Sequence, residues 1–389
     1  MNVPKLRFKE FNDEWQNISL NKIVNFSKGN LLSKADLEEE GLYPCVLYGQ
    51  LYTKYSEVIR TVYSKTNRND KNLIMSKYGD ILIPSSGETP MDISTASCIM
   101  LDNILLGGDI NILSPKNCDG RFLSYLINNN KRKEIAKLAQ GHSVVHLYND
   151  NLRKININIP QLNEQKRIAD TLELLDKKIE HQTKKIEDIK LFKKGLIKDI
   201  FSSELLKEIN IRDIGKIVTG TTPSKENKKY WENGNVTWIT PTDINYERDI
   251  FSSISTLTRE GLEKGRFIPK NSILVTCIAS IGKNAVIKVN GSCNQQINAI
   301  IPNENYNSNY IYYLMEYISP YLQAIAGTSA TAIVNKETFE RVKVKVHPLE
   351  EQKKIDCLLS HIETKIMLED KLLHKLKQLK KGLMQNMFI

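Results

Sequence analysis

Residues 164–201 read EQKRIADTLELLDKKIEHQTKKIEDIKLFKKGLIKDIF, and this stretch decides the fold because it occurs twice in the chain. Residues 351–388 align with it without a gap, and fourteen of the 38 positions are identical. The identical positions include the initial Glu-Gln-Lys, the Lys-Lys-Gly-Leu tetrad near the end and the final Phe. The chain therefore contains an internal repeat.

Apolar side chains recur in both copies at alternating spacings of four and three residues, a heptad pattern whose side chains face one partner helix. Both copies interrupt this seam at the same two places, by Gln182 and Lys193 in the first and by Glu369 and Lys380 in the second. At ~1.5 Å per residue each helix is expected to be ~57 Å long. Such a helix needs a partner along its seam, and the other copy is the expected partner, although two unrelated amphipathic helices would also give apolar stripes. The predicted helix–helix contacts are Ile168, Leu172, Leu175, Ile179, Ile186, Ile189, Leu196, Ile355, Leu359, Ile362, Ile366, Leu373, Leu376 and Leu383.

Length and composition set the frame for the rest of the chain. Its 389 residues have room for two or three domains, and 41% are hydrophobic. The net charge of +10 favours an acidic polymer as partner, although a lysine excess also suits a solvated surface. The six cysteines show no CxxC spacing, which argues against a metal cluster or a disulfide framework. No run reaches 18 apolar residues and residues 1–8 lack an apolar signal region, so we expect a cytoplasmic protein without membrane contact.

The chain alternates between globular and helical parts. Residues 1–159 show mixed α/β patterns, with a strand at 81–84, a polar loop after it at 85–90, and two strands joined by a glycine turn within 105–113. A helix at 122–140 before Gly141 and a strand at 154–159 follow. At Pro160 the apolar period changes from 2 to 3.5, which marks a boundary because proline cannot continue a β-ladder.

The second globular part repeats this plan loosely, since residues 214–218, 273–275, 313–314 and 342–346 match 20–24, 81–83, 125–126 and 155–159. The predicted fold class is α+β, with two mixed α/β domains joined by two long antiparallel coiled-coil helices. The predicted boundaries are 1–159 and 204–346 for the domains, and 160–203 and 347–389 for the helices. The two helix sequences are more similar to each other than the two domain sequences are. This suggests a common scaffold that carries two domains with different recognition properties.

No catalytic machinery is recognisable. The sequence contains no GxxxxGKS or GxxxxGKT phosphate loop, GxSxG elbow, GxGxxG fingerprint or aminomethyltransferase tetrad such as DPPY. His142 and His146 have the spacing of zinc ligands on a helix, but they follow Gly141 without an adjacent Glu. Asp243 and Glu247 form a carboxylate pair of the kind that loops contain by chance. We therefore predict no catalytic residue, metal site or cofactor in this chain.

Polar, aromatic and lysine side chains cluster in loops that follow strands, and the aromatics of the second half, Trp238 among them, are of the type expected to be exposed. Hydroxyls, amides and lysines hold phosphates, whereas Asn, Gln and Arg read base edges. As a set on a basic chain these residues favour DNA, although each alone also fits a turn or a polar core position. The candidate DNA contacts are Tyr48, Gln50, Lys54, Ser85, Ser86, Thr89, Thr221, Thr222, Ser224, Lys225, Tyr230, Trp231, Ser280, Lys283, Gln295 and Gln296.

The chain resembles the specificity (S) subunit of type I restriction–modification systems over its full length. The resemblance is carried by four segments: Gly-Thr-Thr-Pro-Ser at 220–224 with Tyr-Trp at 230–231, Gly-Lys at 282–283, Asn-Gln-Gln-Ile at 294–297, and the paired helices. Each helix begins with Pro, Leu and Glu-Gln-x-x-Ile, at 160–168 and 348–355. The first domain lacks the Gly-Thr-Thr-Pro and Tyr-Trp signatures and has Phe26-Ser27-Lys28-Gly29 where they would begin.

The resemblance implies that each globular half is a target recognition domain reading one half of a bipartite double-stranded DNA target. The helices would fix the unread spacer, and ~57 Å parallels at most ~17 base pairs at ~3.4 Å rise. Two modification (M) subunits carrying S-adenosylmethionine and two restriction (R) subunits using ATP and Mg²⁺ would supply the chemistry. The alternatives are an enzyme with a fused S-like module and a coiled-coil adaptor that binds protein without DNA specificity.

Overall fold

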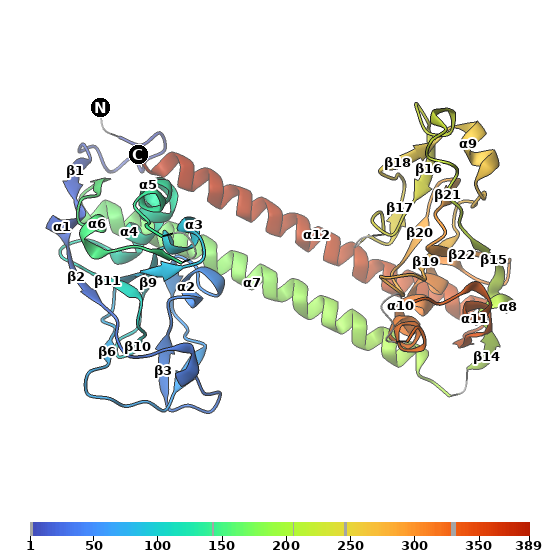
Figure 1. Cartoon of the computed structure of the whole chain (residues 1–389), viewed down its shortest axis with the longest axis horizontal. Coiled ribbons are helices and arrows are strands. Elements are labelled where there is room, and N and C mark those ends of the chain that lie inside the picture. The colour runs from blue at the N-terminus through green and yellow to red at the C-terminus, as the bar shows by residue number, and fades with distance from the viewer. Residues whose placement is uncertain (1–2, 142–143, 205, 245–246, 328–331) are drawn as a thin grey trace. The chain divides into compact units, whose positions relative to one another are not determined.

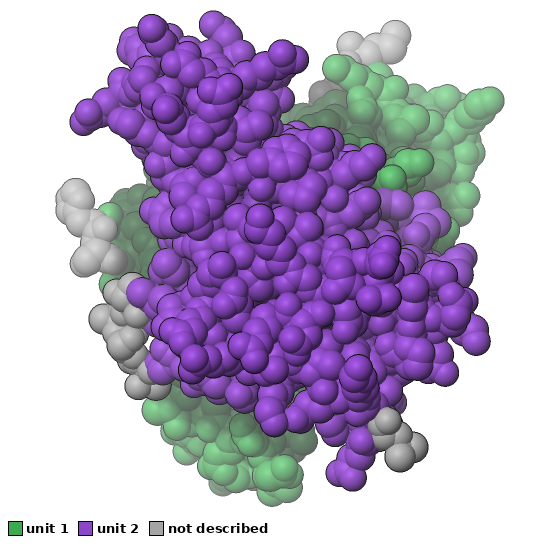
Figure 2. All heavy atoms as spheres, turned by 90° about the vertical axis from the view of Figure 1, so that its right-hand side faces the viewer, with its two compact units in different colours: residues 1–183, 371–389 green, residues 184–370 purple. Residues whose placement is uncertain are grey.

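The computed structural model describes residues 3–141, 144–204, 206–244, 247–327 and 332–389. The chain divides into two compact units, one of residues 1–183 and 371–389 and the other of residues 184–370. Figure 1 labels the elements along the chain, and Figure 2 distinguishes the two units by colour. Among the described residues, no helix is both long enough and apolar enough to cross a membrane.

The first unit is built around a five-stranded sheet of order β2-β11-β7-β9-β4. Its strands are β2 (Val24–Lys28), β4 (Val58–Ile59), β7 (Asp80–Pro84), β9 (Ser97–Ile99) and β11 (Ile110–Pro115). The apolar run 81–83 is wholly buried, as expected for a central strand. Three smaller sheets have the orders β5-β3-β10-β6, β1-β13 and β12-β8. Their strands are β1 (Gln16–Ser19), β3 (Tyr43–Val46), β5 (Ser64–Thr66), β6 (Ile74–Met75), β8 (Ser86–Gly87), β10 (Leu105–Leu106), β12 (Val145–His146) and β13 (Asn156–Ile159).

Short helices complete the first unit. They are α1 (Leu20–Ile23), α2 (Gln50–Thr53), α3 (Pro90–Ile93), α4 (Gly120–Leu126), α5 (Arg132–Lys137) and α6 (Asn149–Leu152). The helix predicted at 122–140 is present as α4 and α5 with a π-helical segment, Ile127–Lys131, between them. It ends earlier than predicted, because Gln140 instead forms a β-bridge with His146.

The second unit has a five-stranded sheet of order β15-β22-β19-β20-β17, a three-stranded sheet β18-β16-β21 and the pair β14-β23. The strands are β14 (Lys207–Asn210), β15 (Gly215–Thr219), β16 (Val236–Ile239), β17 (Asp249–Ile250), β18 (Ser255–Leu257), β19 (Ile273–Thr276), β20 (Asn284–Ile287), β21 (Gly291–Cys293), β22 (Ile297–Pro302) and β23 (Lys343–Val346). The helices are α8 (Ile211–Ile214), α9 (Arg259–Lys264), α10 (Ser308–Ile325) and α11 (Lys336–Arg341).

The two globular parts share one plan. When the strands of each five-stranded sheet are numbered along the chain, their order across the sheet is 1-5-3-4-2 in both domains. In both domains the first and last strands also form a separate antiparallel pair. The alternating segments at 155–159 and 342–346 are these last strands. The predicted fold class, with its duplicated mixed α/β domain, is therefore confirmed.

The predicted long helices are α7 (Leu162–Phe201) and α12 (Leu349–Met387), of 40 and 39 residues. Ion pairs show that they run antiparallel in the second unit. In the second unit Lys185 pairs with Glu369 at 2.6 Å and Lys193 with Glu363 at 2.9 Å, so partners on α12 fall in number as those on α7 rise.

Every predicted seam position is buried or half-buried. The helix ends, however, pack on more than the other helix. In the first unit Ile168 and Leu172 join Met384, Met387 and other apolar residues of the domain in one core. The expectation that the second helix is the partner along the whole seam is incomplete, because each helix end also forms a wall of its domain's core.

The Glu-Gln pair that opens both repeats joins each long helix to its domain. The buried Gln165 accepts a hydrogen bond from the backbone N–H of Asp119 at 3.0 Å and donates one to the carbonyl of Pro160 at 2.8 Å. Gln352 makes the equivalent bond to the N–H of Asn307 at 2.9 Å. Asp119 and Asn307 are the N-caps of α4 and α10. In both repeats a glutamine amide thus joins the start of a long helix to the start of a domain helix.

We expect Gln165→Leu to lower the free energy of unfolding by about 1–3 kcal/mol, because it leaves a backbone N–H and a carbonyl without a partner in a buried place. Urea unfolding followed by circular dichroism measures this loss. The exposed neighbour Lys166 provides the matched control, since Lys166→Leu should change stability by no more than about 0.5 kcal/mol. Equal effects of the two substitutions would contradict the assigned role.

Candidate nucleic-acid interface

Loops from several strands meet at one edge of the second domain. Thr219, the last residue of β15, pairs with Asn298, and Thr276, the last of β19, pairs with Ile297 at the start of β22. The loops 220–224, 277–283 and 294–296 therefore leave the sheet side by side. We call them the recognition loops of the second domain.

Backbone hydrogen bonds hold these loops together. The N–H of Gly220 donates to Ile297 O at 3.0 Å, that of Thr221 to Cys293 O at 2.9 Å, and that of Cys277 to Gln296 O at 2.8 Å. A Cβ atom at Gly220 would lie 2.1 Å from the carbonyl oxygen of Asn294, so only glycine fits this approach. The first residue of the Gly-Thr-Thr-Pro segment is thus fixed by packing between loops.

Two tryptophans brace the first recognition loop. The indole N–H of Trp231 donates to Ser224 O at 2.9 Å, and that of Trp238 to Thr221 O at 3.1 Å. Their rings meet edge to face, with centroids 4.8 Å apart. Trp238 is only 4% exposed, so the expectation of an exposed aromatic there is wrong: its ring fills the core under the loop it supports.

The loops bring together most second-domain candidates. Thr222 and Gln295 are exposed and hydrogen-bonded to each other, and Gln296 is half-buried and accepts from the side chain of Asn294. The hydroxyl of Thr221 is buried without a hydrogen-bond partner among the described residues. Hydroxyl and amide groups at a solvent-facing edge can bond to phosphates and base edges.

The remaining second-domain candidates surround this centre. Ser224 is exposed on the first loop, Lys225 directly after it is also exposed, and Tyr230 is half-buried. Ser280 is half-buried and Lys283 exposed on the loop that follows β19. Lys228 and Lys229, which border the first loop, add positive charge beside it.

The first domain presents the same edge with other side chains. Lys28 at the end of β2 pairs with Asn111, and Pro84 at the end of β7 with Ile110. Gly29 follows β2 as Gly220 follows β15, and a Cβ there would lie 2.1 Å from the carbonyl oxygen of Gly107. Gly29 therefore serves as the close-approach glycine of a domain that lacks the Gly-Thr-Thr-Pro segment.

Three first-domain candidates are buried, which argues against direct DNA contact. Gln50 accepts from the N–H of Leu47 at 3.1 Å and donates to Ser64. Ser86 lies 3.0 Å from Nδ1 of His146. Ser85, which is 4% exposed, donates its backbone N–H to Asp109 O at 2.7 Å. The predicted polar loop at 85–90 is thus partly strand β8, and its serines hold neighbouring loops.

Tyr48, Lys54 and Thr89 remain exposed, although Thr89 also caps α3 by accepting from the N–H of Asp92 at 3.2 Å. The sequence reasoning missed exposed Lys28 at the strand end, whose Nζ lies 3.5 Å from Asp109. Matching the end of β2 with the end of β15 in the repeat would have found it.

The described residues offer no sign of a catalytic centre in this edge. Burial raises the pKa of the thiols of Cys277 and Cys293 to about 11 and about 12, so both are protonated at neutral pH and are poor nucleophiles. Asp243 accepts hydrogen bonds from the N–H and hydroxyl of Thr240 and thereby closes a turn. The described part of the chain contains no group of three or more His, Cys, Asp or Glu side chains able to hold a metal, and His142 lies outside it.

Sequence comparison identifies the two halves. The family model described as the type I restriction modification DNA specificity domain matches residues 12–191 and again 204–378. The type I restriction enzyme MjaIX specificity subunit of Methanocaldococcus jannaschii is 36% identical over 188 residues, which are 46% of this chain and 43% of that protein. The EcoR124I/EcoR124II specificity subunit of Escherichia coli is 35% identical over 161 residues, or 39% of each chain. These two matches thus span less than half of either relative.

Longer matches are more distant. The putative MjaX specificity subunit of M. jannaschii is 23% identical over 98% of this chain and 95% of its own. Among solved structures, the type I restriction–modification S subunit from M. genitalium has a TM-score of 0.67 at 17% identity and covers 100% of this chain and 99% of its own. That structural likeness shows the shared fold. Since the family model matches most of the chain, in two successive copies, the protein belongs to the family of type I restriction–modification specificity subunits.

Proposed function

We propose that this chain is the DNA-addressing subunit of a type I restriction–modification complex, in which each domain reads one half of a bipartite double-stranded target. One observation carries the proposal: both domains present loops at the same sheet edge, each pinned by a close-approach glycine, Gly29 or Gly220, but with different side chains. A shared scaffold with different loops suits the reading of two different half-sites.

The long helices would serve as spacer and assembly platform. At ~1.5 Å per residue α7 is ~60 Å long, which parallels at most ~18 base pairs at ~3.4 Å rise. In the second unit Leu191 and Phe192 are 70% and 62% exposed on α7, and adjacent large apolar side chains are typical of a partner contact. We infer that two M subunits dock on the helices and that two R subunits join the complex.

The proposal assigns no chemical step to this chain. S-adenosylmethionine would be bound by the M subunits, and ATP with Mg²⁺ by the R subunits. The residues of this chain would bind, orient and space the DNA. Purified chain incubated with duplex DNA, S-adenosylmethionine, ATP and Mg²⁺ should neither methylate nor cut it, whereas addition of the M subunits should start adenine methylation. Modification by the chain alone would favour the fused enzyme instead.

Lysines beside the first recognition loop give a test of the DNA interface. We expect combined Lys225→Ala, Lys228→Ala and Lys229→Ala to weaken binding to specific and nonspecific duplexes by similar factors, because phosphate contacts carry no sequence information. The slope of log affinity against log salt should fall by about 0.9 for each phosphate that a lysine no longer neutralises. Fluorescence anisotropy of labelled duplexes from low to high salt, with the M subunits present, measures both effects.

The control is a second lysine triple on the same unit but outside the recognition loops and the long helices, Lys207→Ala, Lys336→Ala and Lys343→Ala, all exposed. It removes the same charge and should leave the salt slope nearly unchanged. Equal slopes for both triples would place the DNA elsewhere. Affinity that does not depend on salt would favour the protein-binding adaptor.

A further inference from the structure

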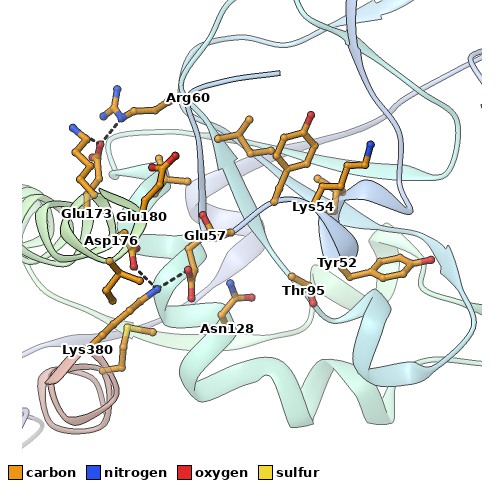
Figure 3. A pocket seen from close by; sticks show the side chains of 18 of the residues that line it. Tyr52, Lys54, Glu57, Arg60, Thr95, Asn128, Glu173, Asp176, Glu180 and Lys380 are labelled. Atoms are coloured by element: carbon orange, nitrogen blue, oxygen red, sulfur yellow. Dashed lines mark hydrogen bonds and ion pairs between the residues drawn. The ribbon is translucent and has the colours of Figure 1, made fainter. Parts of the chain in front are cut away.

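The helix seam is interrupted by a lysine in both repeats, and both lysines are held by carboxylates. In the first unit Lys380 of α12 is 19% exposed, and its Nζ lies 2.6 Å from Asp176 of α7 and 2.8 Å from Glu57 of the domain. The hydroxyl of Tyr125 donates to the other oxygen of Asp176 at 2.6 Å, and its ring centroid lies 5.6 Å from Nζ. Figure 3 shows Lys380 reaching between Asp176 and Glu57, beside a cleft of about 940 Å³.

The second unit contains the corresponding network. Lys193 of α7 is 11% exposed and lies 2.9 Å from both Glu363 of α12 and Glu316 of the domain helix α10. The hydroxyl of Tyr313 donates to Glu363 at 2.9 Å, and the ring centroid of Tyr313 lies 5.3 Å from Nζ. Lys193 and Lys380 occupy the same repeat position, as do Asp176 and Glu363. The seam defect is therefore a duplicated polar site.

Each network joins three elements: the two long helices and the domain. Burial lowers the pKa of Lys380, but Glu57 and Asp176 raise it by more, so the pKa lies above its ordinary value and Lys380 is charged at neutral pH. Taking charges out of water is costly, and an apolar residue would pack in the seam without that cost. A buried ion pair therefore adds little to stability, but it can disfavour other alignments of the two helices in which the charges are not paired.

The two ion pairs fit one antiparallel register, since the residue numbers of Lys193 with Glu363 and of Lys380 with Asp176 add to the same total. The rest of the seam is mostly Leu and Ile, which tolerate a slip by one heptad because apolar residues then face apolar residues again. The same slip of ~10 Å would put Lys380 opposite Ala169 or Thr183, and it would put Asp176 and Glu363 opposite Leu, Ile or Met. Lys193 would then face Asp356 or Asp370, so the second network opposes the slip through Glu363.

We propose that Lys193 and Lys380, with Glu363 and Asp176, are the positioning residues that select the register of the spacer helices and thereby the number of unread base pairs. The second half of this statement rests on the proposed DNA-addressing function, whereas the register itself does not. Glu57 and Glu316 belong to the domains and contact the same lysines, so they also help to position each domain on the helices.

The test neutralises the networks while keeping their size. The variant combines Lys193→Met, Lys380→Met, Asp176→Asn, Glu363→Gln, Glu57→Gln and Glu316→Gln in the full chain. Spin labels attached after Lys166→Cys and Lys375→Cys at these exposed positions, with Cys357→Ser, report the helix register in the first unit by pulsed electron paramagnetic resonance. The parent should give one narrow distance. The neutralised variant should stay helical and give a second distance displaced by ~10 Å, one heptad at ~1.5 Å per residue.

Two further variants sharpen the result. Lys194→Met with Lys381→Met removes the exposed lysines next to the network in each repeat, and it should keep the parent distance. Neutralising only Lys380, Asp176 and Glu57 should also keep one distance, because the Lys193 pair remains. A single parental distance in the fully neutralised variant, or loss of its helicity, would overturn the proposal, since the networks would then be redundant or merely stabilising.

Mapping of methylated adenines by the complete complex tests the spacer separately. The neutralised variant should accept targets whose spacer differs by about 3 base pairs, from a slip of ~10 Å at ~3.4 Å per pair. If the parent complex methylates no bipartite target, the DNA-addressing function fails while the distance result stands. If the register slips but the target spacer stays unique, the link between register and spacing is wrong.

Discussion

Replacing residues 1–159 by the first domain of another type I specificity subunit is expected to change one half of the DNA target and to leave the other half as it was. The hydrogen bonds that hold the recognition loops of the second domain come from its own strands, such as Ile297 O to Gly220 and Cys293 O to Thr221. The exchange should therefore not disturb them. Each base pair altered in the first half-site should shift preference by about 1–3 kcal/mol.

The graft needs the residues through which the first domain grips the helices. Arg7 makes a bidentate ion pair with Glu164, Asp119 binds Gln165, and the hydroxyl of Tyr125 binds Asp176. These domain residues should be kept in the donor so that a loss of folding is not mistaken for a loss of recognition. Sequencing of methylated adenines in cells that carry the hybrid and its M subunits gives the new target.

The reciprocal exchange of residues 204–346 is the control, and it should change only the second half-site. A hybrid in which both half-sites change would contradict independent reading by the two domains. A hybrid that keeps the entire original target would place recognition outside the exchanged loops.

Inserting seven residues into α7 between positions 177 and 190 is expected to abolish assembly or lengthen the spacer. Seven residues add two turns, or ~10.5 Å, and preserve the heptad phase. A single insertion lengthens one helix but leaves its antiparallel partner short. The ion pairs of Lys380 and of Lys193 could then no longer form in the same alignment of the two helices. We therefore expect the single insertion to lose methylation activity.

A matched pair of insertions resolves the two outcomes. Adding seven residues to α7 and seven to α12 between 364 and 377 keeps Lys380 with Asp176 and Lys193 with Glu363. The paired variant should fold and methylate a target whose spacer is about 3 base pairs longer, given ~3.4 Å per base pair. An active paired variant that keeps the original spacer would show that the helices do not set the distance.

The repeat made much of the architecture predictable. Heptad spacing, the change of period at Pro160 and the alternation at 155–159 are local signals, and α7 and β13 appear where these signals place them. Their side chains face a partner at a fixed period whatever that partner is. Local periodicity therefore sufficed for the helices and for the order of domains along the chain.

The site was less predictable, because exposure depends on what neighbouring loops do. Gln50, Ser85 and Ser86 look like polar loop residues in sequence, but each is buried by a segment far along the chain, including Ser64, Asp109 and His146. Trp238 lies among hydroxyl and lysine residues in the sequence, as an exposed binding aromatic would, yet its side chain is buried under the recognition loop. A single sequence does not tell a side chain that meets a ligand from one that holds a loop.

By itself the sequence determined the duplication, the two long helices and the family, since all three depend on spacing and identity along the chain. Only the tertiary structure decided which polar residues face solvent and why the seam contains charge. Lys193 and Lys380 break the heptad pattern in the sequence, and their carboxylate partners on the opposite helix and the domain become visible only after folding. The physical reason is that a buried cation is tolerated where distant parts of the chain bring anions to it.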